Sequence, residues 1–154
     1  MVAVAEGSIC QTLLDLYHKE AIIVEPAGAM SIAALEPYAE RIRGKNVVCV
    51  ISGGNNDIMR TAEIKERALL HAQLKHYFIV KFNQVPGELR MFLNNIIPEN
   101  VDITRFEYFK KNNIKTGSDL IGMELEKKPD LELILENFTT NKINYTKIDP
   151  EDNL

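Results

Sequence analysis

The sequence VCVISGGNND, at residues 48–57, decides the fold of the first half of this chain. An apolar run passes directly into a serine and two glycines, so a buried strand is predicted to end in a tight turn before a helix. The Ser52 hydroxyl at the end of that strand can donate or accept a hydrogen bond. Two interpretations stand at this point. The loop either holds a small polar ligand, or it is an ordinary turn in which a serine caps the next helix.

A second segment of the same kind lies upstream, where IIVEPAGA occupies residues 22–29. Continuous apolar strands that run into small-residue turns are typical of parallel sheets covered on both faces. Periodicity of 3.6 residues marks the helices around them, and Ser8 is a candidate N-cap for the first helix. We therefore predict strands at 21–24 and 46–51, and helices at 8–19, 27–43 and 57–74.

The two segments together resemble a known family. EPAGA at 25–29 and SGGNND at 52–57 are similar to the end of the catalytic domain of threonine dehydratases, which are pyridoxal-phosphate enzymes of the tryptophan-synthase-β fold type. VAEGSICQT at 4–12 is similar to the same family, and the downstream half resembles its single ACT-like regulatory domain. The resemblance implies an α/β remnant of the catalytic domain with a connecting helix at residues 1–75, and an ACT-like domain at residues 76–154.

The resemblance also implies roles for individual residues. Ser52 would hydrogen-bond the pyridine nitrogen of pyridoxal phosphate, while Gly53 and Gly54 give the ring room to approach. Glu25 would face the edge of the cofactor ring or order the loop; alternatively, it simply places a carboxylate at a helix N-terminus, where the dipole favours it. No segment matches the family's Schiff-base lysine or its glycine-rich phosphate loop. We therefore interpret the chain as a C-terminal fragment with no catalytic residue, no bound cofactor and no activity of its own.

From His76 the hydrophobic period changes to two, as in a half-buried strand. Strands are predicted from His76 to the Pro86-Gly87 break and at 101–110, 118–126 and 143–148, with helices at 87–97 and 129–141. The order βαββαβ predicts a ferredoxin-like α+β unit, with an antiparallel sheet and both helices on one face. Within 101–110 the apolar residues change face, which indicates either a β-bulge or two partly covered faces.

The segment PGEL at residues 86–89 resembles the helix entry of ACT and ACT-like domains. Free N–H groups and the helix dipole attract anions at such a position. We expect Pro86, Gly87 and Glu88 to meet the carboxylate of an amino-acid effector, and Val85 and Leu89 to contact its side chain. The resemblance implies isoleucine as the inhibitor and valine as its antagonist. Pro-Gly before a helix is also common in αβ proteins that bind nothing there.

Composition excludes several other classes of protein. A net charge of −4 without a basic stripe gives no electrostatic footprint for nucleic acid. No apolar run approaches the roughly 20 residues that cross a bilayer. Isolated Cys10 and Cys49 favour a reducing, cytoplasmic setting, and the histidines show no spacing typical of metal ligands.

The sequence thus predicts the regulatory portion of a threonine dehydratase, a lyase that converts threonine to 2-oxobutanoate and ammonia in isoleucine biosynthesis. Family resemblance further implies allosteric control and a homo-oligomer. An alternative from another class also stands. In that alternative, the chain is a stand-alone, non-catalytic module for amino-acid binding or assembly.

Overall fold

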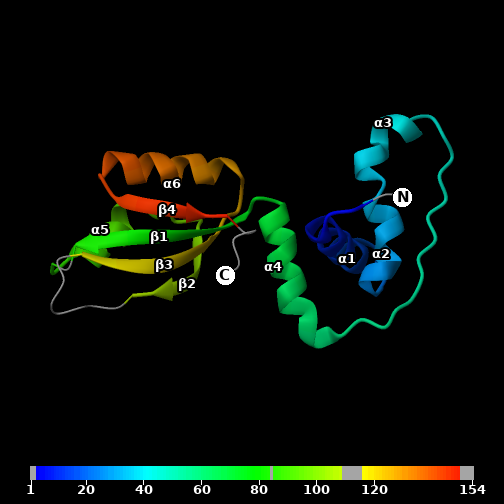
Figure 1. The fold of residues 1–154 in the computed structure, drawn as a ribbon, viewed down its shortest axis with the longest axis horizontal. Helices are drawn as coiled ribbons and strands as arrows, with labels where there is room; N and C mark the ends of the chain where they lie inside the picture. The colour runs from blue at the N-terminus through cyan, green and yellow to red at the C-terminus, as the bar shows by residue number, and fades with distance from the viewer. Residues whose placement is uncertain (1–2, 84, 109–115, 150–154) are drawn as a thin grey trace. The chain divides into compact units, whose positions relative to one another are not determined.

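The computed structural model describes residues 3–83, 85–108 and 116–149 of the 154-residue chain. Internal contacts divide the chain into two compact units (Figure 1). We call Met1–Ala72 the first unit and Gln73–Leu154 the second unit. Each has its own hydrophobic core.

The first unit is built from helices joined by extended segments (Figure 1). Its elements are α1 (Glu6–Glu20), α2 (Pro26–Ala33), the 3₁₀ turn η1 (Glu36–Tyr38), α3 (Ala39–Ile42), the 3₁₀ turn η2 (Ile58–Arg60) and α4 (Thr61–His71). Helix α1 packs against both α2 and α4. The buried residues that join them are Cys10, Leu13, Leu16, Val24, Ala29, Ile64 and Ala68.

The strands predicted at 21–24 and 46–51 are wrong, because neither segment pairs with another strand in the described structure. Val48 and Val50 have exposed fractions of 89% and 72%. A strand exists only when a neighbour pairs its N–H and C=O groups. No such neighbour is found among the described residues of this unit.

Helix boundaries in the first unit also differ from the predictions. Ser8 is not the N-cap of α1, since the helix begins at Glu6 and Ser8 is buried inside it. The predicted helix at 27–43 is broken, because Pro37 lacks an N–H and disfavours the helical conformation of the residue before it. The predicted helix at 57–74 begins as a 3₁₀ turn, where the Asp57 carboxylate accepts a hydrogen bond from the Met59 N–H at 2.9 Å.

The second unit has the predicted βαββαβ order. Its elements are β1 (Lys75–Asn83), α5 (Glu88–Asn95), β2 (Asp102–Glu107), β3 (Thr116–Glu124), α6 (Pro129–Thr140) and β4 (Asn144–Ile148). The strands form one antiparallel sheet in the order β2-β3-β1-β4. The bulge, one of the two alternatives for this strand, is confirmed by a shift of the β2–β3 register between Ile103 and Arg105.

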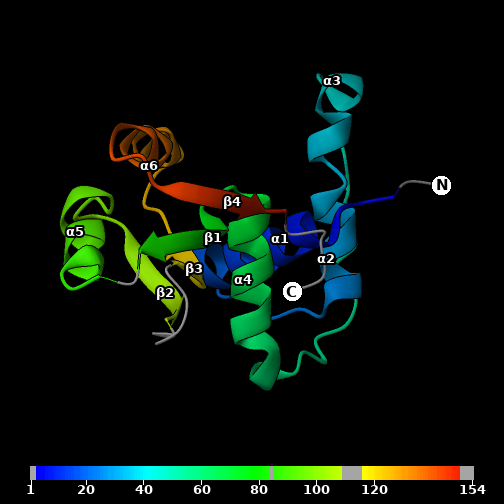
Figure 2. The same ribbon diagram turned by 60° about the vertical axis from the view of Figure 1, so that its left-hand side comes forward.

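Both helices of the second unit cover the same face of the sheet (Figure 2). Phe92 of α5 and Ile96 at its C-cap share one core with Ile134 and Phe138 of α6 and with alternate residues of β1. Phe78 lies at the centre of this core. Its ring centroid is 5.5 Å from that of Phe138 and 5.9 Å from that of Tyr145. The period of two in the sequence therefore reflects side chains that point alternately toward the helices and toward the open face of the sheet.

No helix in the described part of the chain is both long enough and apolar enough to cross a lipid bilayer.

Candidate functional site

The two motifs of the first unit meet in space, although helices α2 and α3 lie between Glu25 and Ser52 in the sequence. The Glu25 N–H donates to the Gly53 carbonyl at 3.3 Å. A Cβ on Gly28 would collide with the Ser52 carbonyl oxygen, and a Cβ on Gly53 would collide with the Glu25 carboxylate. Gly53 also has a φ of +73°, which favours glycine. These glycines are therefore required for the close approach of the two loops.

Glu25 and Ser52 lie on the two adjoining loops, at the start of α2 and just before Gly53. Glu25 occupies the N-cap position of α2, but its side chain makes no capping hydrogen bond and lies against Gly53. Ser52 caps no helix, because the next helical turn is capped by Asp57. Gly54 has ordinary contacts only, since a Cβ there would lie 3.5 Å from the Ile23 carbonyl oxygen.

Ser31, which sequence reasoning missed, connects helix α2 to the segment at residues 46–51 through hydrogen bonds. The Ser31 hydroxyl donates to the Val50 carbonyl at 2.9 Å, and the Cys49 thiol approaches the Ser31 carbonyl at 3.5 Å. The available signal was a lone serine in the otherwise apolar sequence PAGAMSIA. These contacts hold the segment that leads into Ser52.

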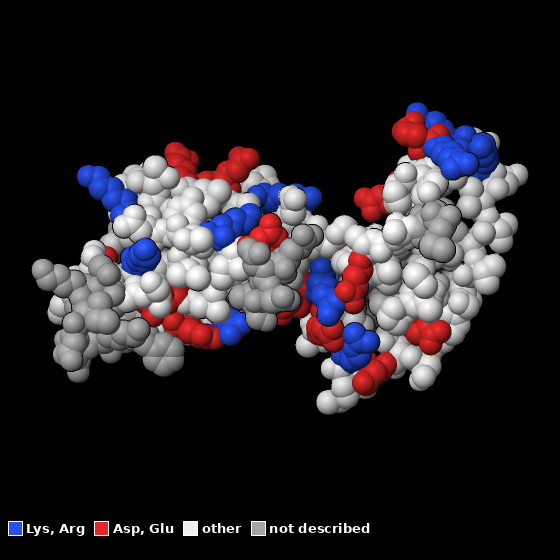
Figure 3. Space-filling view, viewed as in Figure 1, with Lys and Arg blue, Asp and Glu red and all other residues white. Residues whose placement is uncertain are grey.

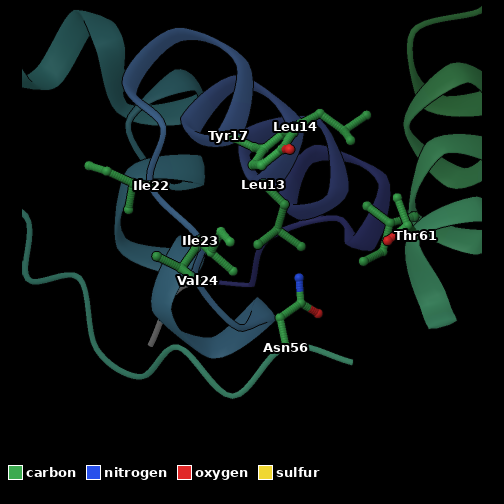
Figure 4. A pocket seen from close by; sticks show the side chains of 9 residues that line it. Leu13, Leu14, Tyr17, Ile22, Ile23, Val24, Asn56 and Thr61 are labelled. Carbon is green, nitrogen blue, oxygen red and sulfur yellow. The ribbon is translucent and has the colours of Figure 1, made fainter. Parts of the chain in front are cut away.

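A small hollow lies beside this loop (Figure 4). Apolar side chains form most of its wall, and the Asn56 amide points toward Leu13. Its lining residues are Leu13, Leu14, Tyr17, Ile22, Ile23, Val24, Asn56, Thr61 and Ile64. Because the lining carries no charged side chain, it suits an apolar group better than a phosphate.

The predicted effector site lies at the turn between β1 and α5, where the surface forms an open groove. Of the five predicted residues, Pro86, Gly87 and Leu89 line this groove, whereas Val85 and Glu88 do not. The Glu88 carboxylate instead accepts a hydrogen bond from the Asn83 side-chain amide at 3.0 Å. Helix α5 begins at Glu88, one residue after the predicted start, so Pro86 precedes the Gly87 N-cap.

Gly87 is the N-cap of α5 and has a φ of +92°. No heavy atom lies within 4 Å of the position that a Cβ would occupy, so the helix start is open to a ligand. The groove also contains Arg90, Leu93 and Asn94, which sequence reasoning missed. Arg90 and Leu93 lie three and six residues after Gly87, so helical spacing from the PGEL motif could have indicated them.

His76 and Cys10 are two of the described groups whose pKa values are shifted. Burial lowers the pKa of His76, and the nearby Lys147 cation lowers it further. The His76 ring lies 3.0 Å from the Gln73 carbonyl through Nε2. Burial raises the pKa of the Cys10 thiol, which therefore stays protonated and is a poor nucleophile. No group of three potential metal ligands occurs within the described ranges.

Charges on the surface are mixed in sign. Acidic and basic side chains alternate on the face shown in Figure 3, without an extended basic area. On helix α4, Arg67 pairs with Glu63 at 2.8 Å and also with Glu6 of α1. Glu63 and Arg67 are four residues apart, the spacing at which side chains of opposite charge meet on one face of a helix.

An antiparallel sheet of order β2-β3-β1-β4, with two helices on one face and an open helix start after β1, is consistent with the ACT-like class of regulatory domain. Residues 66–154 match the family model described as the C-terminal regulatory domain of threonine dehydratase. The chain belongs to the threonine dehydratase family and carries this regulatory domain. The match begins within α4, ahead of the predicted boundary at residue 76.

Similar curated proteins agree with this assignment. The biosynthetic L-threonine dehydratase of Bacillus subtilis (strain 168) is 48% identical over 154 residues, which is 100% of this chain and 36% of that protein. The biosynthetic L-threonine dehydratase of Staphylococcus aureus (strain NCTC 8325 / PS 47) is 55% identical over 130 residues, covering 84% of this chain and 31% of that protein. The chain thus spans about a third of the length of these relatives.

Proposed function

We propose that the second unit binds a small aliphatic amino acid and regulates a threonine dehydratase, the lyase that deaminates threonine to 2-oxobutanoate. Isoleucine is the proposed inhibitor and valine its antagonist. The observation that carries this proposal is the open groove at the start of α5, within the part of the chain that matches the regulatory-domain family. Regulatory units of this kind act in assemblies, and we propose a homo-oligomer here as well.

The groove offers complementary chemistry to both ends of an amino acid. The free N–H groups that follow Gly87 attract a carboxylate, since the helix dipole places partial positive charge there. Arg90 adds a full positive charge on the groove wall. Leu89 and Leu93 supply apolar surface for the side chain. Each buried methylene contributes about 0.8 kcal/mol, so alanine should bind more weakly than valine or isoleucine.

We expect isoleucine and valine to shift the amide NMR signals of residues 85–94, with alanine much weaker. Gly87→Val should lower isoleucine affinity at least tenfold, because a β-branched side chain is strained at a φ of +92° and occupies the open helix start. Gly44→Val is the matched control. Gly44 has a φ of +72° and equally open surroundings, but it lies in the first unit. That variant should bind isoleucine normally.

Arg90→Gln tests the contribution of the Arg90 charge separately from that of the N–H groups at the start of α5. It should weaken isoleucine binding several-fold, whereas Arg105→Gln on strand β2 should not. If isoleucine and valine leave the signals of residues 85–94 unchanged in the folded chain, the proposed site is wrong.

We further propose that Glu25, Ser52, Gly53 and Gly54 contribute to a pyridoxal-phosphate site in the complete enzyme. The fit is supported by the glycine-lined approach of the two loops, which leaves Ser52 and Gly53 exposed. When bound, the cofactor supplies the electron sink for elimination of the threonine hydroxyl. The Ser52 hydroxyl would offer a neutral hydrogen-bonding partner to the ring nitrogen, and Glu25 would hold the Gly53 loop in place.

We expect this chain alone to show no threonine dehydratase activity and to retain no pyridoxal phosphate after desalting. The reason is that no segment of it matches the family's lysine or phosphate loop. Keto-acid formation from threonine and the absorbance of retained cofactor measure the two properties. The full-length Bacillus subtilis relative serves as the positive control. Turnover by this chain, or a stable stoichiometric chromophore, would contradict the expectation.

A further inference from the structure

Residues 72–74, which we call the junction turn, carry the chain from helix α4 into strand β1. Gln73 at its centre has a φ of +57°, a backbone conformation that is uncommon for a residue with a side chain. On the β1 side, the Leu125 N–H donates to the Leu74 carbonyl at 2.7 Å, and Leu74 packs against the core of the second unit. The turn is therefore fixed at Leu74, and contacts at Gln73 add to how firmly it is closed.

The ring of His76 supplies such a contact. Its Nε2 atom lies 3.0 Å from the Gln73 carbonyl oxygen, and the residue is only 7% exposed. A carbonyl oxygen accepts hydrogen bonds and never donates them, so Nε2 carries the hydrogen of the neutral ring. Nδ1 is then the nitrogen that takes up a proton on acidification. The neutral ring thus holds the junction turn closed and has a defined site for the proton.

The surroundings of the His76 ring disfavour that proton. Among the described residues, Lys147 of β4 is the charged group recorded to act on the ring, and its charge has the same sign as that of a protonated histidine. Met123 of β3 lies directly opposite His76 and is uncharged. The residues of α6 that are buried on the same face of the sheet, Ile134 and Phe138, are apolar.

The other charged residues at this end of the sheet lie elsewhere. Lys75 and Glu124 hold the adjacent positions of β1 and β3, so the pleat directs them to the opposite face of the sheet. Asp149 follows β4 and is exposed. A proton on Nδ1 would therefore place a charge in a buried site, on the same side of the sheet as Lys147.

We propose that the junction turn is a pH-sensitive joint of the regulatory domain, and that it opens when His76 takes up a proton. A buried charge without solvation is unfavourable, so the protonated ring leaves its place and releases the Gln73 carbonyl. The family model begins within α4, so the joint lies inside the matched domain. The inference does not rest on the effector groove.

The direction of the pH effect follows from the two states of the ring. In the open turn, the ring titrates near its ordinary pKa of about 6.5. In the closed turn, burial and the Lys147 cation keep the pKa of His76 below that value. The closed turn is therefore fully favoured above about pH 6.5, and it loses this advantage as the pH falls from there to the pKa of the closed ring.

NMR of this chain as a function of pH tests the proposal. We expect His76 to titrate below its ordinary pKa, with the proton on Nδ1, and the carbonyl carbon signal of Gln73 to move with the same midpoint. The Ala72 N–H at the C-cap of α4 donates to the Ala68 carbonyl at 2.8 Å. Its protection from exchange, corrected for the intrinsic rate, should fall about threefold or more between about pH 7.5 and about pH 5.5. The Leu125 amide, on the fixed side of the turn, should keep its protection.

Three variants separate the proton from the hydrogen bond. His76→Gln keeps a side-chain N–H for the Gln73 carbonyl but cannot titrate in this range, so Ala72 protection should no longer depend on pH. His18→Gln is the matched control, because His18 is an exposed histidine on α1, and it should keep the pH dependence. Lys147→Gln removes the repelling cation, so the pKa of His76 should rise and the loss of Ala72 protection should shrink.

Titration of His76 at or above its ordinary pKa would overturn the inference. A Gln73 signal that does not follow the titration would overturn it as well, and so would unchanged pH dependence in His76→Gln. If His76→Gln does not fold, an unchanged His76 pKa and unchanged Ala72 protection in Lys147→Gln would decide against it. Isoleucine titration of residues 85–94 reports on the proposed function separately.

Discussion

Phe78→Ala is expected to lower the free energy of unfolding of the second unit by about 3–5 kcal/mol. Phe78 is completely buried and its ring contacts those of Phe138 and Tyr145. Truncation removes the transfer free energy of the ring and leaves a cavity between β1 and the helix α6. Because both helices pack on one sheet face, that cavity lies where the two layers of the unit join.

Urea denaturation followed by amide hydrogen exchange of residues 75–83 measures this loss for the second unit by itself. Ile79→Ala is the control, since Ile79 is the next residue on β1 but faces away from the core and is 37% exposed. It should cost about 1 kcal/mol or less. Equal losses for the two variants would show that the helices do not pack on the Phe78 face.

Gly122→Val is expected to destabilise the second unit by about 1–3 kcal/mol, although valine favours strands. Gly122 lies directly opposite Tyr77 on one side and Arg105 on the other. A Cβ at this position would lie 2.7 Å from Cε1 of the Tyr77 ring and 3.0 Å from the Arg105 Cβ. Tyr77 is only 5% exposed, so its ring lies over the glycine with little freedom to move.

A double-mutant cycle with Tyr77→Ala isolates this contact. Removing the ring should make room for the valine, so Gly122→Val should cost at least about 1 kcal/mol less in the Tyr77→Ala background. Unfolding free energies of the four proteins give the coupling directly. An identical cost in both backgrounds would mean that the Tyr77 ring does not restrict position 122.

Much of the second unit was predictable because its signals are local. Alternation from Phe78 to Phe82, the Pro86-Gly87 break and Pro129 at a helix start each act within a few residues, and the structure has the corresponding elements. The bulge was visible as a change of apolar face in one strand. Sheet order follows from the βαββαβ pattern, because that order allows both helices to cover one face.

The candidate sites were less predictable. Glu25 and Gly53 were linked by family resemblance alone, since no local pattern shows that a backbone hydrogen bond joins them. In the effector groove, the motif indicated Gly87 and Leu89, but it also included Glu88, which does not line the groove, and it left out Arg90, which does. Glu88 is the first residue of α5, and its carboxylate accepts a hydrogen bond from the Asn83 side chain and does not line the groove.

By itself, the sequence determined which segments are apolar, their periodicity and the positions where the chain must turn. Only the tertiary structure decided whether an apolar segment became a strand. In the second unit, β1 lies between β3 and β4, and its backbone N–H and C=O groups pair with those of both strands. Residues 46–51 are also rich in strand-forming valine and isoleucine, but they have no neighbouring strand among the described residues, so they stay unpaired and largely exposed. The physical reason is that strand hydrogen bonds are made between segments, whereas helix hydrogen bonds are made within one.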